Sequence, residues 1–304
     1  YSQRMRKMND KVWVFKFFLM CLYSQFIFTK AIATEYNYQV RTSYVTIPIM
    51  GDKTKYIAGK FNFPIKNHNG AAVVIVHGSN GIDSRGSLHS ESLNHLGFAT
   101  LEVDLWANRG WLASSVGRPQ TVNETLPDTF AALHFLANLP EIDENNIGIL
   151  GFSWGGAVTM LSRSKALANQ YSAELFYAAH IAFYPVCWVY NKVPIYKISE
   201  TTLKPLLILT GEQDDYDEPL SCQLWKENLN INEKKAVNII VYKNATHGFN
   251  GTEPEKVVAD PFSHLGKGGE VVMKESPLAR KASIEAVNVF FSQKLHKNIK
   301  SKVR

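Results

Sequence analysis

Six short runs rich in Val, Ile and Leu are the feature that most constrains how this chain can fold. The runs lie at 71–76, 98–103, 146–150, 180–184, 205–210 and 237–242. Continuous apolar runs are typical of strands in a parallel sheet, because such a sheet is covered on both faces. Two earlier segments, 38–49 and 55–64, alternate between apolar and polar residues and predict an antiparallel pair. We therefore expect a mostly parallel sheet of about eight strands.

Helical patterns separate these runs. The stretches with helical spacing cover 85–97, 123–140, 153–168 and 276–295. The last begins with Ser276 as a cap and Pro277 at the first helical position. Alternating strands and helices predict one α/β doubly wound domain over 34–296, with helices on both faces and a basic tail at 297–304. Ligands bind such sheets at the carboxyl ends of the strands, so candidate catalytic residues should follow strands.

Residues 1–33 have the pattern of a secretory signal peptide. A basic start, "RMRKMNDK", precedes the apolar stretch "VWVFKFFLMCLYSQFIF", and Ala31 and Ala33 supply the small residues of a cleavage site. An uncleaved membrane anchor is the alternative, but the uninterrupted apolar core at 17–28 is short for a span of ~20 residues. We expect cleavage after Ala33 and a secreted or periplasmic protein that contacts a membrane only through an uncleaved leader.

Most of the net charge of +6 resides in this leader. The leader holds six of the 33 basic residues and one of the 27 acidic residues, which leaves 27 basic against 26 acidic residues. A nucleic-acid-binding protein would need a basic face, and the remainder shows no basic cluster. The charge pattern therefore argues against a nucleic-acid partner.

Two cysteines follow the leader, Cys187 and Cys222. An even number in an exported protein permits one disulfide, with two buried free thiols as the alternative. Neither HExxH nor CxxC spacing occurs, so we expect no metal and no cofactor.

The stretch "GFSWGG" at 151–156 follows an apolar run and precedes a helical pattern. Gly151 and Gly155 flank Ser153 as in G-x-S-x-G, a motif that presents a serine hydroxyl on a sharp strand-to-helix turn. The N-terminus of the following helix favours negative charge that develops nearby. The alternative is that the glycines serve close packing and Ser153 is an ordinary helix cap. The motif predicts a nucleophilic serine if a base and an acid accompany it.

Later strand ends supply both partners. His247 lies in "KNATHGFN" just past the last apolar run, where it would accept the proton of Ser153. The preceding run leads into "GEQDDYDEP", in which Asp214, Asp215 and Asp217 are all candidate acids. His77 also follows a strand, but it starts the loop after an earlier run, and we interpret it as structural.

Acyl transfer also requires donors for the negative oxygen of the transition state. The backbone N–H of Trp154, directly after the nucleophile, is one candidate. The glycine-rich loop "HGSNG" at 77–81 offers the second, for which we choose Ser79, with Asn80 as the neighbour that could replace it.

Together these motifs resemble the dienelactone hydrolase family of the α/β-hydrolase superfamily. The resemblance covers about 40–293, through "VVIVHGSNG", "EVDLWANRG", "DTFAALHFLANLPEIDENNIGILGFSWGG", "LLILTGEQDDYDEPLSC" and "YKNATHGF". It implies that Asp214 is the acid and that Ser79 supplies an oxyanion N–H. Members that hydrolyse dienelactone carry cysteine where Ser153 stands, so the resemblance implies an esterase-type member.

The resemblance also places Cys187 and Cys222 on neighbouring crossovers, where a bridge would hold the loop of the acid.

Residues after the fourth strand are candidates for substrate binding. Arg109 could hold a substrate carboxylate through its paired N–H groups, or it could pair with a structural acid. Arg118 follows in the same loop. The tryptophans near the expected site, which line an apolar pocket or belong to the core, are Trp106, Trp111, Trp154 and Trp188. The stretch 261–270 is either a mobile flap over the site or a surface loop.

We therefore expect an exported serine hydrolase that cleaves carboxylic esters or lactones through an acyl-enzyme. An acyltransferase or peptidase with the same triad is the enzymatic alternative. A binding or envelope protein that has kept the fold without activity is the other, although Ser153, Asp214 and His247 are all present.

Overall fold

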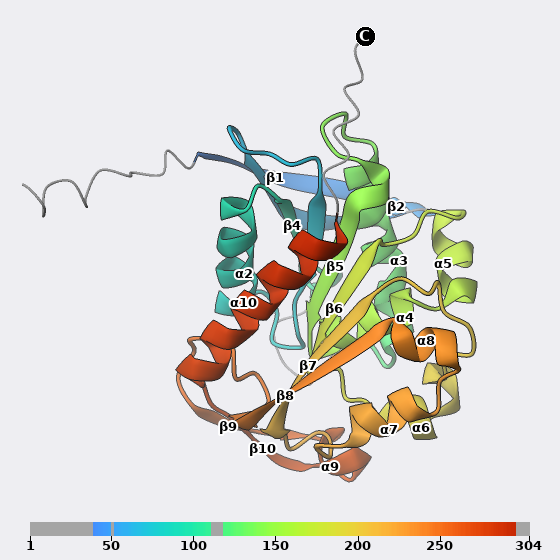
Figure 1. Cartoon of the computed structure of the whole chain (residues 1–304), viewed down its shortest axis with the longest axis vertical. Coiled ribbons are helices and arrows are strands. Elements are labelled where there is room, and N and C mark those ends of the chain that lie inside the picture. Colours follow the sequence, from blue (N-terminus) through green and yellow to red (C-terminus); the bar gives the residue numbers. More distant parts are fainter. Residues whose placement is uncertain (1–38, 50–51, 111–117, 296–304) are drawn as a thin grey trace, which may run out of the picture. The chain divides into compact units, whose positions relative to one another are not determined.

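An eight-stranded sheet forms the centre of the computed structural model, which describes residues 39–49, 52–110 and 118–295 (Figure 1). The strand order is β1-β2-β4-β3-β5-β6-β7-β8; β2 pairs antiparallel with β1 and β4, and all other pairs are parallel. The strands are β1 (Val40–Ile49), β2 (Asp52–Pro64), β3 (Ala72–Val76), β4 (Ala99–Asp104), β5 (Ile147–Phe152), β6 (Ala179–Phe183), β7 (Leu206–Gln213) and β8 (Val237–Thr246). The predicted α/β architecture is confirmed. The expected leader at 1–33 and tail at 297–304 lie outside the described residues.

Helices cover both faces of the sheet because each strand sends alternate side chains to opposite sides. Val73 of β3 belongs to one buried cluster and Val74 to the other. The cluster around Val73 is closed by α2 (Ser84–His95) and α10 (Pro277–Lys294). The cluster around Val74 is closed by α3 (Leu126–Ala137), α4 (Trp154–Ser162) and α5 (Lys165–Ser172). Short 3-10 segments lie at η1 (Ala107–Arg109), η2 (Val122–Thr125), η3 (Glu144–Asn146) and η4 (Pro194–Tyr196).

The helix predicted over 153–168 is two helices. Ser164 is extended (φ −61°, ψ 120°) and bridges to Thr201, while the Lys165 N–H donates to the carbonyl of Glu200. Arg163, fully buried before the break, donates from Nε to the carbonyl of Lys204. Tertiary contacts with the 200–204 segment therefore interrupt a stretch whose local pattern favours one helix.

Further elements follow the parallel strands β6 to β8. They are α6 (Trp188–Lys192), α7 (Ser221–Glu227), α8 (Ile231–Lys235), β9 (Lys256–Asp260), α9 (Ser263–Gly266) and β10 (Gly269–Met273). β9 and β10 pair as an antiparallel hairpin that lies at the lower edge of Figure 1 with α9. The hairpin is fastened to the loop after β7, because Asp215 accepts the N–H of His264 on its carbonyl and the N–H of Val272 on its carboxylate. The stretch 261–270 is thus the structured turn of a hairpin.

Among the helices of the described ranges, none combines the length and the hydropathy that crossing a membrane requires.

Candidate active site

Ser153 occupies the sharp turn between β5 and α4. Its backbone is left-handed (φ 52°, ψ −108°), a conformation that costs a non-glycine residue about 1–3 kcal/mol. Hydrogen bonds hold the turn: the Ser153 N–H donates to the carbonyl of Phe183, and the Gly155 N–H donates to the carbonyl of His77. The turn directs the hydroxyl away from the helix, because no helix-capping bond forms from this side chain. The geometry favours a presented hydroxyl over an ordinary helix cap.

The glycines around Ser153 allow backbone segments to approach each other without side chains between them. A Cβ at Gly151 would lie 2.0 Å from the carbonyl oxygen of Gly155, and a Cβ at Gly155 would lie 2.2 Å from that of Val76. A Cβ at Gly156 would lie 2.5 Å from the carbonyl oxygen of Phe183. These obstacles are backbone atoms, which cannot rotate away, so the turn requires glycine at each position.

Ser153, His247 and Asp214 form a continuous hydrogen-bonded chain at the ends of β5, β8 and β7. His247 Nε2 lies 2.8 Å from Ser153 Oγ, and His247 Nδ1 lies 2.8 and 3.0 Å from the two Asp214 carboxylate oxygens. A carboxylate only accepts hydrogen bonds, so it favours the tautomer with the proton on Nδ1 and leaves Nε2 free to accept. This is the arrangement in which an imidazole can take the proton of a serine hydroxyl.

The other two acids of the loop are engaged elsewhere. Asp215 binds the β9–β10 hairpin, and Asp217 accepts the backbone N–H of Cys187. Burial raises the pKa of Asp217 to about 7. Of the three candidates left open by the sequence, only Asp214 faces His247.

Two tyrosine rings enclose His247, which is 1% exposed. The Tyr184 and Tyr216 ring centroids lie 4.6 and 4.3 Å from that of the imidazole. Tyr184 directly follows β6, with φ 36°, and its hydroxyl donates to Asn250 Oδ1 at 2.6 Å. The rule that site residues follow strands could have identified Tyr184, but the sequence analysis did not select either tyrosine. The two rings pack against the imidazole and help to bury it.

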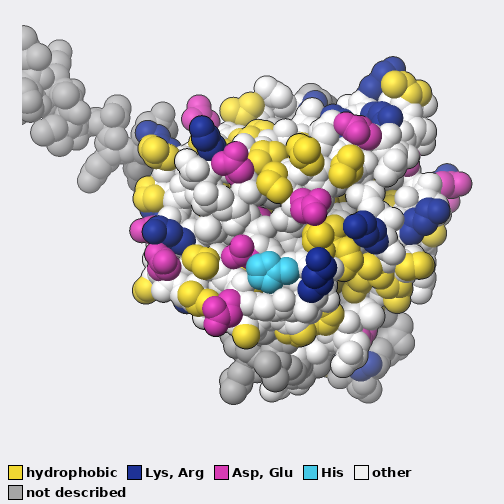
Figure 2. All heavy atoms as spheres, turned by 90° about the horizontal axis from the view of Figure 1, so that it is seen from below, with side chains coloured by type: hydrophobic (Ala, Val, Ile, Leu, Met, Phe, Trp, Pro, Cys, Tyr) yellow, Lys and Arg dark blue, Asp and Glu magenta, His cyan; other side chains and the backbone are white. Residues whose placement is uncertain are grey.

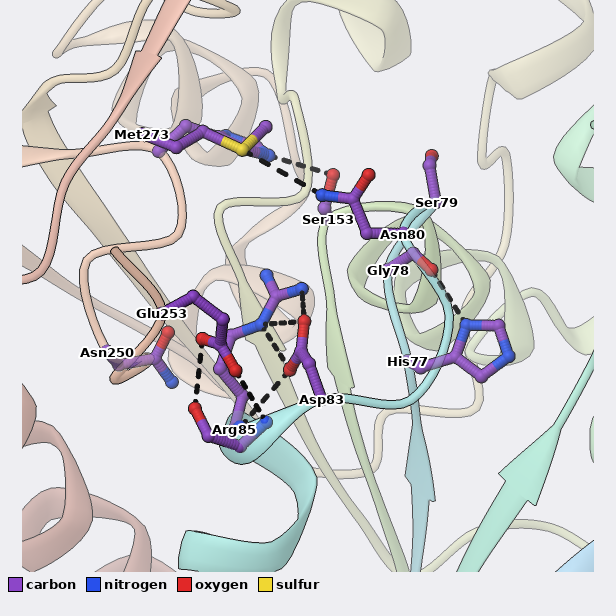
Figure 3. A network of polar contacts seen from close by, with 12 residues as sticks. His77, Gly78, Ser79, Asn80, Asp83, Arg85, Ser153, Asn250, Glu253 and Met273 are labelled. Carbon is purple, nitrogen blue, oxygen red and sulfur yellow. Dashed lines mark hydrogen bonds and ion pairs between the residues drawn. The ribbon is translucent and has the colours of Figure 1, made fainter. Parts of the chain in front are cut away.

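A buried arginine, Arg85, binds the hydroxyl of one of these tyrosines. Arg85 donates from Nη1 to the Tyr184 hydroxyl at 3.1 Å and pairs with Asp83 through Nε and Nη2. Figure 3 shows this pair beneath the loop that carries Gly78 and Ser79, with Glu253 against the start of α2. Because Asp83 occupies the guanidinium fork, Arg85 acts here as a structural cation.

The candidate oxyanion donors lie beside the nucleophile. A Cβ built on Gly78 would lie 3.4 Å from Ser153 Cβ, so the loop of Ser79 passes directly alongside Ser153. The Ser79 carbonyl accepts the indole N–H of Trp106 at 3.1 Å, and its hydroxyl accepts Arg118 Nη1. The side chain of Asn80, the other residue considered for this role, donates from its amide to Met273 Sδ at 3.9 Å. Within the described ranges, the N–H groups of Ser79 and Trp154 have no protein acceptor, so both are available to an oxyanion.

His77 has the structural role expected for it. Its Nε2 accepts the N–H of Leu105 at 2.9 Å, and its Nδ1 lies 2.7 Å from the carbonyl of Gly78. It therefore connects the loops after β3 and β4 and does not contact Ser153.

A cavity of about 310 Å³ opens beside Ser153. Its walls are mainly apolar and include Trp154, Trp188, Val122, Val189, Val193 and Phe262. Arg118 and the hydroxyl-bearing Ser79 stand at the side near the nucleophile. Of the tryptophans considered above, Trp154 and Trp188 line this cavity, whereas Trp106 is a buried support of Ser79.

The expectation that Arg109 binds substrate is wrong for this geometry. Its guanidinium pairs with the fully buried carboxylate of Asp128 and donates to the carbonyls of Leu105 and Glu124. A buried carboxylate needs such a partner, so the structural alternative applies. The other residue proposed for this role, Trp111, lies outside the described residues.

Cys187 and Cys222 are joined by a disulfide with an S–S distance of 2.03 Å. The bond connects the residue before α6 with α7. Asp217 lies against it and belongs to the loop that also carries Asp214. The bridge thus holds one side of the acid loop, as the sequence analysis expected.

The surface over the site carries charges of both signs. Figure 2 shows acidic and basic side chains interspersed with hydrophobic ones on the face that lies at the bottom of Figure 1. Because charges of both signs lie on this face, it does not attract ligands of one charge over a long range. Ligand selection therefore depends on contacts inside the site.

Comparisons with known proteins agree with the motifs. A family model described as "Dienelactone hydrolase family" matches residues 58–295. Similar solved structures include a dienelactone hydrolase-like promiscuous phosphotriesterase from metagenomic libraries, with 18% identity and a TM-score of 0.59 over 84% of this chain and 99% of that one. A dienelactone hydrolase from Anabaena variabilis ATCC 29413 has 17% identity and a TM-score of 0.58, over 85% and 100% of the chains. Esterase 2 of Thermogutta terrifontis, phosphorylated by paraoxon, has 14% identity and a TM-score of 0.58, over 82% and 94%. A search of curated proteins gave no match.

Proposed function

Because this chain belongs to the dienelactone hydrolase family, we propose that it is an exported serine hydrolase that cleaves carboxylic esters or lactones through an acyl-enzyme. The observation that carries this proposal is the chain of contacts from Asp214 through His247 to Ser153 Oγ. A hydroxyl beside a neutral imidazole gains the base that it lacks in water, and a buried carboxylate stabilises the imidazolium that then forms.

In the acylation step, Ser153 Oγ attacks the carbonyl carbon of the ester while His247 Nε2 takes the hydroxyl proton. The carbonyl oxygen becomes negative and receives the N–H groups of Trp154 and Ser79. When the tetrahedral intermediate collapses, the C–O bond to the alcohol breaks and His247 returns the proton to the leaving oxygen. The alcohol departs and the acyl group stays on Ser153.

In the deacylation step, water attacks the acyl carbon and gives a proton to His247. The bond to Ser153 Oγ then breaks, the proton returns to Ser153, and the carboxylic acid is released. A lactone follows the same steps, except that its alcohol stays joined to the acyl group throughout, and the product is a hydroxy acid.

Labelling with a fluorophosphonate tests this proposal, since the probe reacts with activated serines. We expect the native protein to be labelled on the peptide that contains Ser153, and Ser153→Ala to remain unlabelled. Ser87→Ala, at an exposed serine on α2, is the matched control and should be labelled like the native chain. Labelling of Ser153→Ala, or no labelling of the native chain, would contradict the proposed nucleophile.

The proposal of export rests on the leader pattern at 1–33 and on the disulfide, a bond that persists in oxidising compartments. The N-terminal sequence of the protein recovered outside the cytoplasm should begin at Thr34. Recovery of the chain only in the cytoplasm with its leader intact would contradict export.

A further inference from the structure

Arg118 lines the cavity and contacts Ser79 of the oxyanion loop, and its guanidinium lies near two aromatic rings. Its Cζ lies 5.2 Å from the Trp154 ring centroid and 4.8 Å from that of Phe262. Contacts of this kind between a guanidinium and aromatic faces are favourable and restrict the plane of the group.

Two of the three guanidinium nitrogens also have side-chain partners, whereas the buried Nε has none among the described residues. Nη1 donates to Ser79 Oγ, and Nη2 donates to Asp260 Oδ1 at 3.4 Å. The side chain is only 10% exposed, and the carboxylate of Asp260 is 3% exposed. Asp260 accepts further bonds from the Tyr216 hydroxyl at 2.8 Å and from the Phe262 N–H at 2.9 Å. A substrate carboxylate near Arg118 would thus meet a cation that already has a buried counter-charge.

Ser79, in contrast, depends on Arg118. Its carbonyl is held by the Trp106 indole and its hydroxyl by Arg118. The Gly78 carbonyl, in the peptide that carries the Ser79 N–H, is contacted by His77 Nδ1 and by the N–H of Gly81. Arg118 therefore restrains the side chain of the residue that carries this N–H. An oxyanion donor is effective only when it is held in place before charge develops.

We propose that Arg118 is a positioning residue that holds the Ser79 N–H in the oxyanion hole, and that it is not a binding site for a substrate carboxylate. This inference rests on the proposed function. The remaining walls of the cavity are mainly apolar, so the part of the ester that enters it is an uncharged, apolar group.

The test is Arg118→Gln, assayed with p-nitrophenyl butyrate and with the anionic mono-p-nitrophenyl glutarate. Removing one oxyanion donor costs about 10²–10³ in kcat, so loosening one should lower kcat by roughly 10- to 100-fold. We expect the same factor for both esters, with KM changed less than about 3-fold. A selective rise in KM for the glutarate, with the butyrate unaffected, would show a carboxylate site and overturn the proposal.

A double-mutant cycle separates positioning from general damage. Ser79→Ala removes the hydroxyl that Arg118 holds but keeps the N–H, so it should lower kcat, and adding Arg118→Gln should cause little further loss. Fully additive effects would contradict the proposed coupling. Arg41→Gln is the control. Arg41 also lies over an aromatic ring, that of Phe63, but it occupies an exposed position of β1. It should leave kcat unchanged.

Arg118→Lys serves if the glutamine variant does not fold, since lysine keeps the charge but not the planar fork. Its kcat should also fall, and an unchanged kcat would overturn the proposal. Fluorophosphonate labelling keeps the two proposals apart. If native Ser153 is not labelled, the proposed function fails; if it is labelled and the Arg118 variants turn over normally, only the positioning role fails.

Discussion

The disulfide between Cys187 and Cys222 should supply a large part of the stability of this domain. The cysteines are 35 residues apart. Closing a loop of that length lowers the conformational entropy of the unfolded chain, which raises its free energy by about 4 kcal/mol. Domains have a total stability of about 5–15 kcal/mol. Both cysteines are buried, at 0% and 3% exposure, so a reductant acts mainly on the unfolded or partly opened chain.

Urea unfolding of the oxidised and the reduced protein measures this contribution. We expect reduction to lower the free energy of unfolding by about 2–4 kcal/mol, since measured effects often fall below the loop-entropy value. The paired variant Cys187→Ala/Cys222→Ala should be destabilised too and should show no further response to reductant. Equal stability with and without reductant, or two free thiols in the native protein by mass measurement, would refute the reasoning.

Three further predictions concern other residues, two of them with a control substitution. Asp214→Asn removes the acceptor that orients His247 and should lower kcat by about 10²–10⁴ with little change in KM, whereas Asp215→Asn should cause no comparable loss in the same ester assay. Gly151→Ala places a Cβ 2.0 Å from a carbonyl oxygen and should destabilise the domain by at least ~3 kcal/mol in thermal unfolding. Gly70→Ala is its control. A Cβ at Gly70 meets no atom within 4 Å, so this substitution should cost only about 1 kcal/mol of backbone strain. Burial raises the pKa of Glu102 from 4.5 to about 7. As the pH rises, the Glu102 carboxyl therefore loses its proton in the unfolded chain before it does so in the folded chain. The free energy of unfolding should fall as the pH rises from about 4.5 to 7. Glu102→Gln should therefore stabilise the protein by at most ~3 kcal/mol at pH 8 and by little at pH 4, and an equal effect at both values would contradict the assignment.

The parallel core could be predicted because β3 to β7 are mostly buried on both faces, although the edge strand β8 is largely exposed. Burial on both faces removes the polar alternation that other strands show, and the resulting apolar runs are visible without knowing their partners. The candidate site could be predicted for a related reason. Strand ends at one edge of a parallel sheet lie close together, so Ser153, His247 and the acidic loop after the preceding strand could be grouped from their positions alone. The choice of Asp214 within that loop came from the family resemblance.

The sequence could not decide side-chain pairing between distant segments. Arg109 and Arg118 follow the same strand and have the same chemistry, yet Arg109 turns to the buried Asp128 while Arg118 lies beside Ser79. That difference depends on which acid lies within reach after packing. The break between α4 and α5 has a similar origin, because it depends on contacts with the 200–204 segment.

The β9–β10 hairpin is the part of the site that the sequence revealed least, and it connects the two halves of the proposed machinery. Its strands have only 5 residues each, and glycines near the turn favour a surface loop in any local analysis. Yet Asp260 at the end of β9 receives the hydroxyl of Tyr216, which packs on His247, and also pairs with Arg118, which holds Ser79. One carboxylate, that of Asp260, therefore binds both the tyrosine that packs on the base and the arginine that holds the oxyanion loop. Because a buried carboxylate that loses one partner must be satisfied by the other, a change in the hairpin should affect both at once.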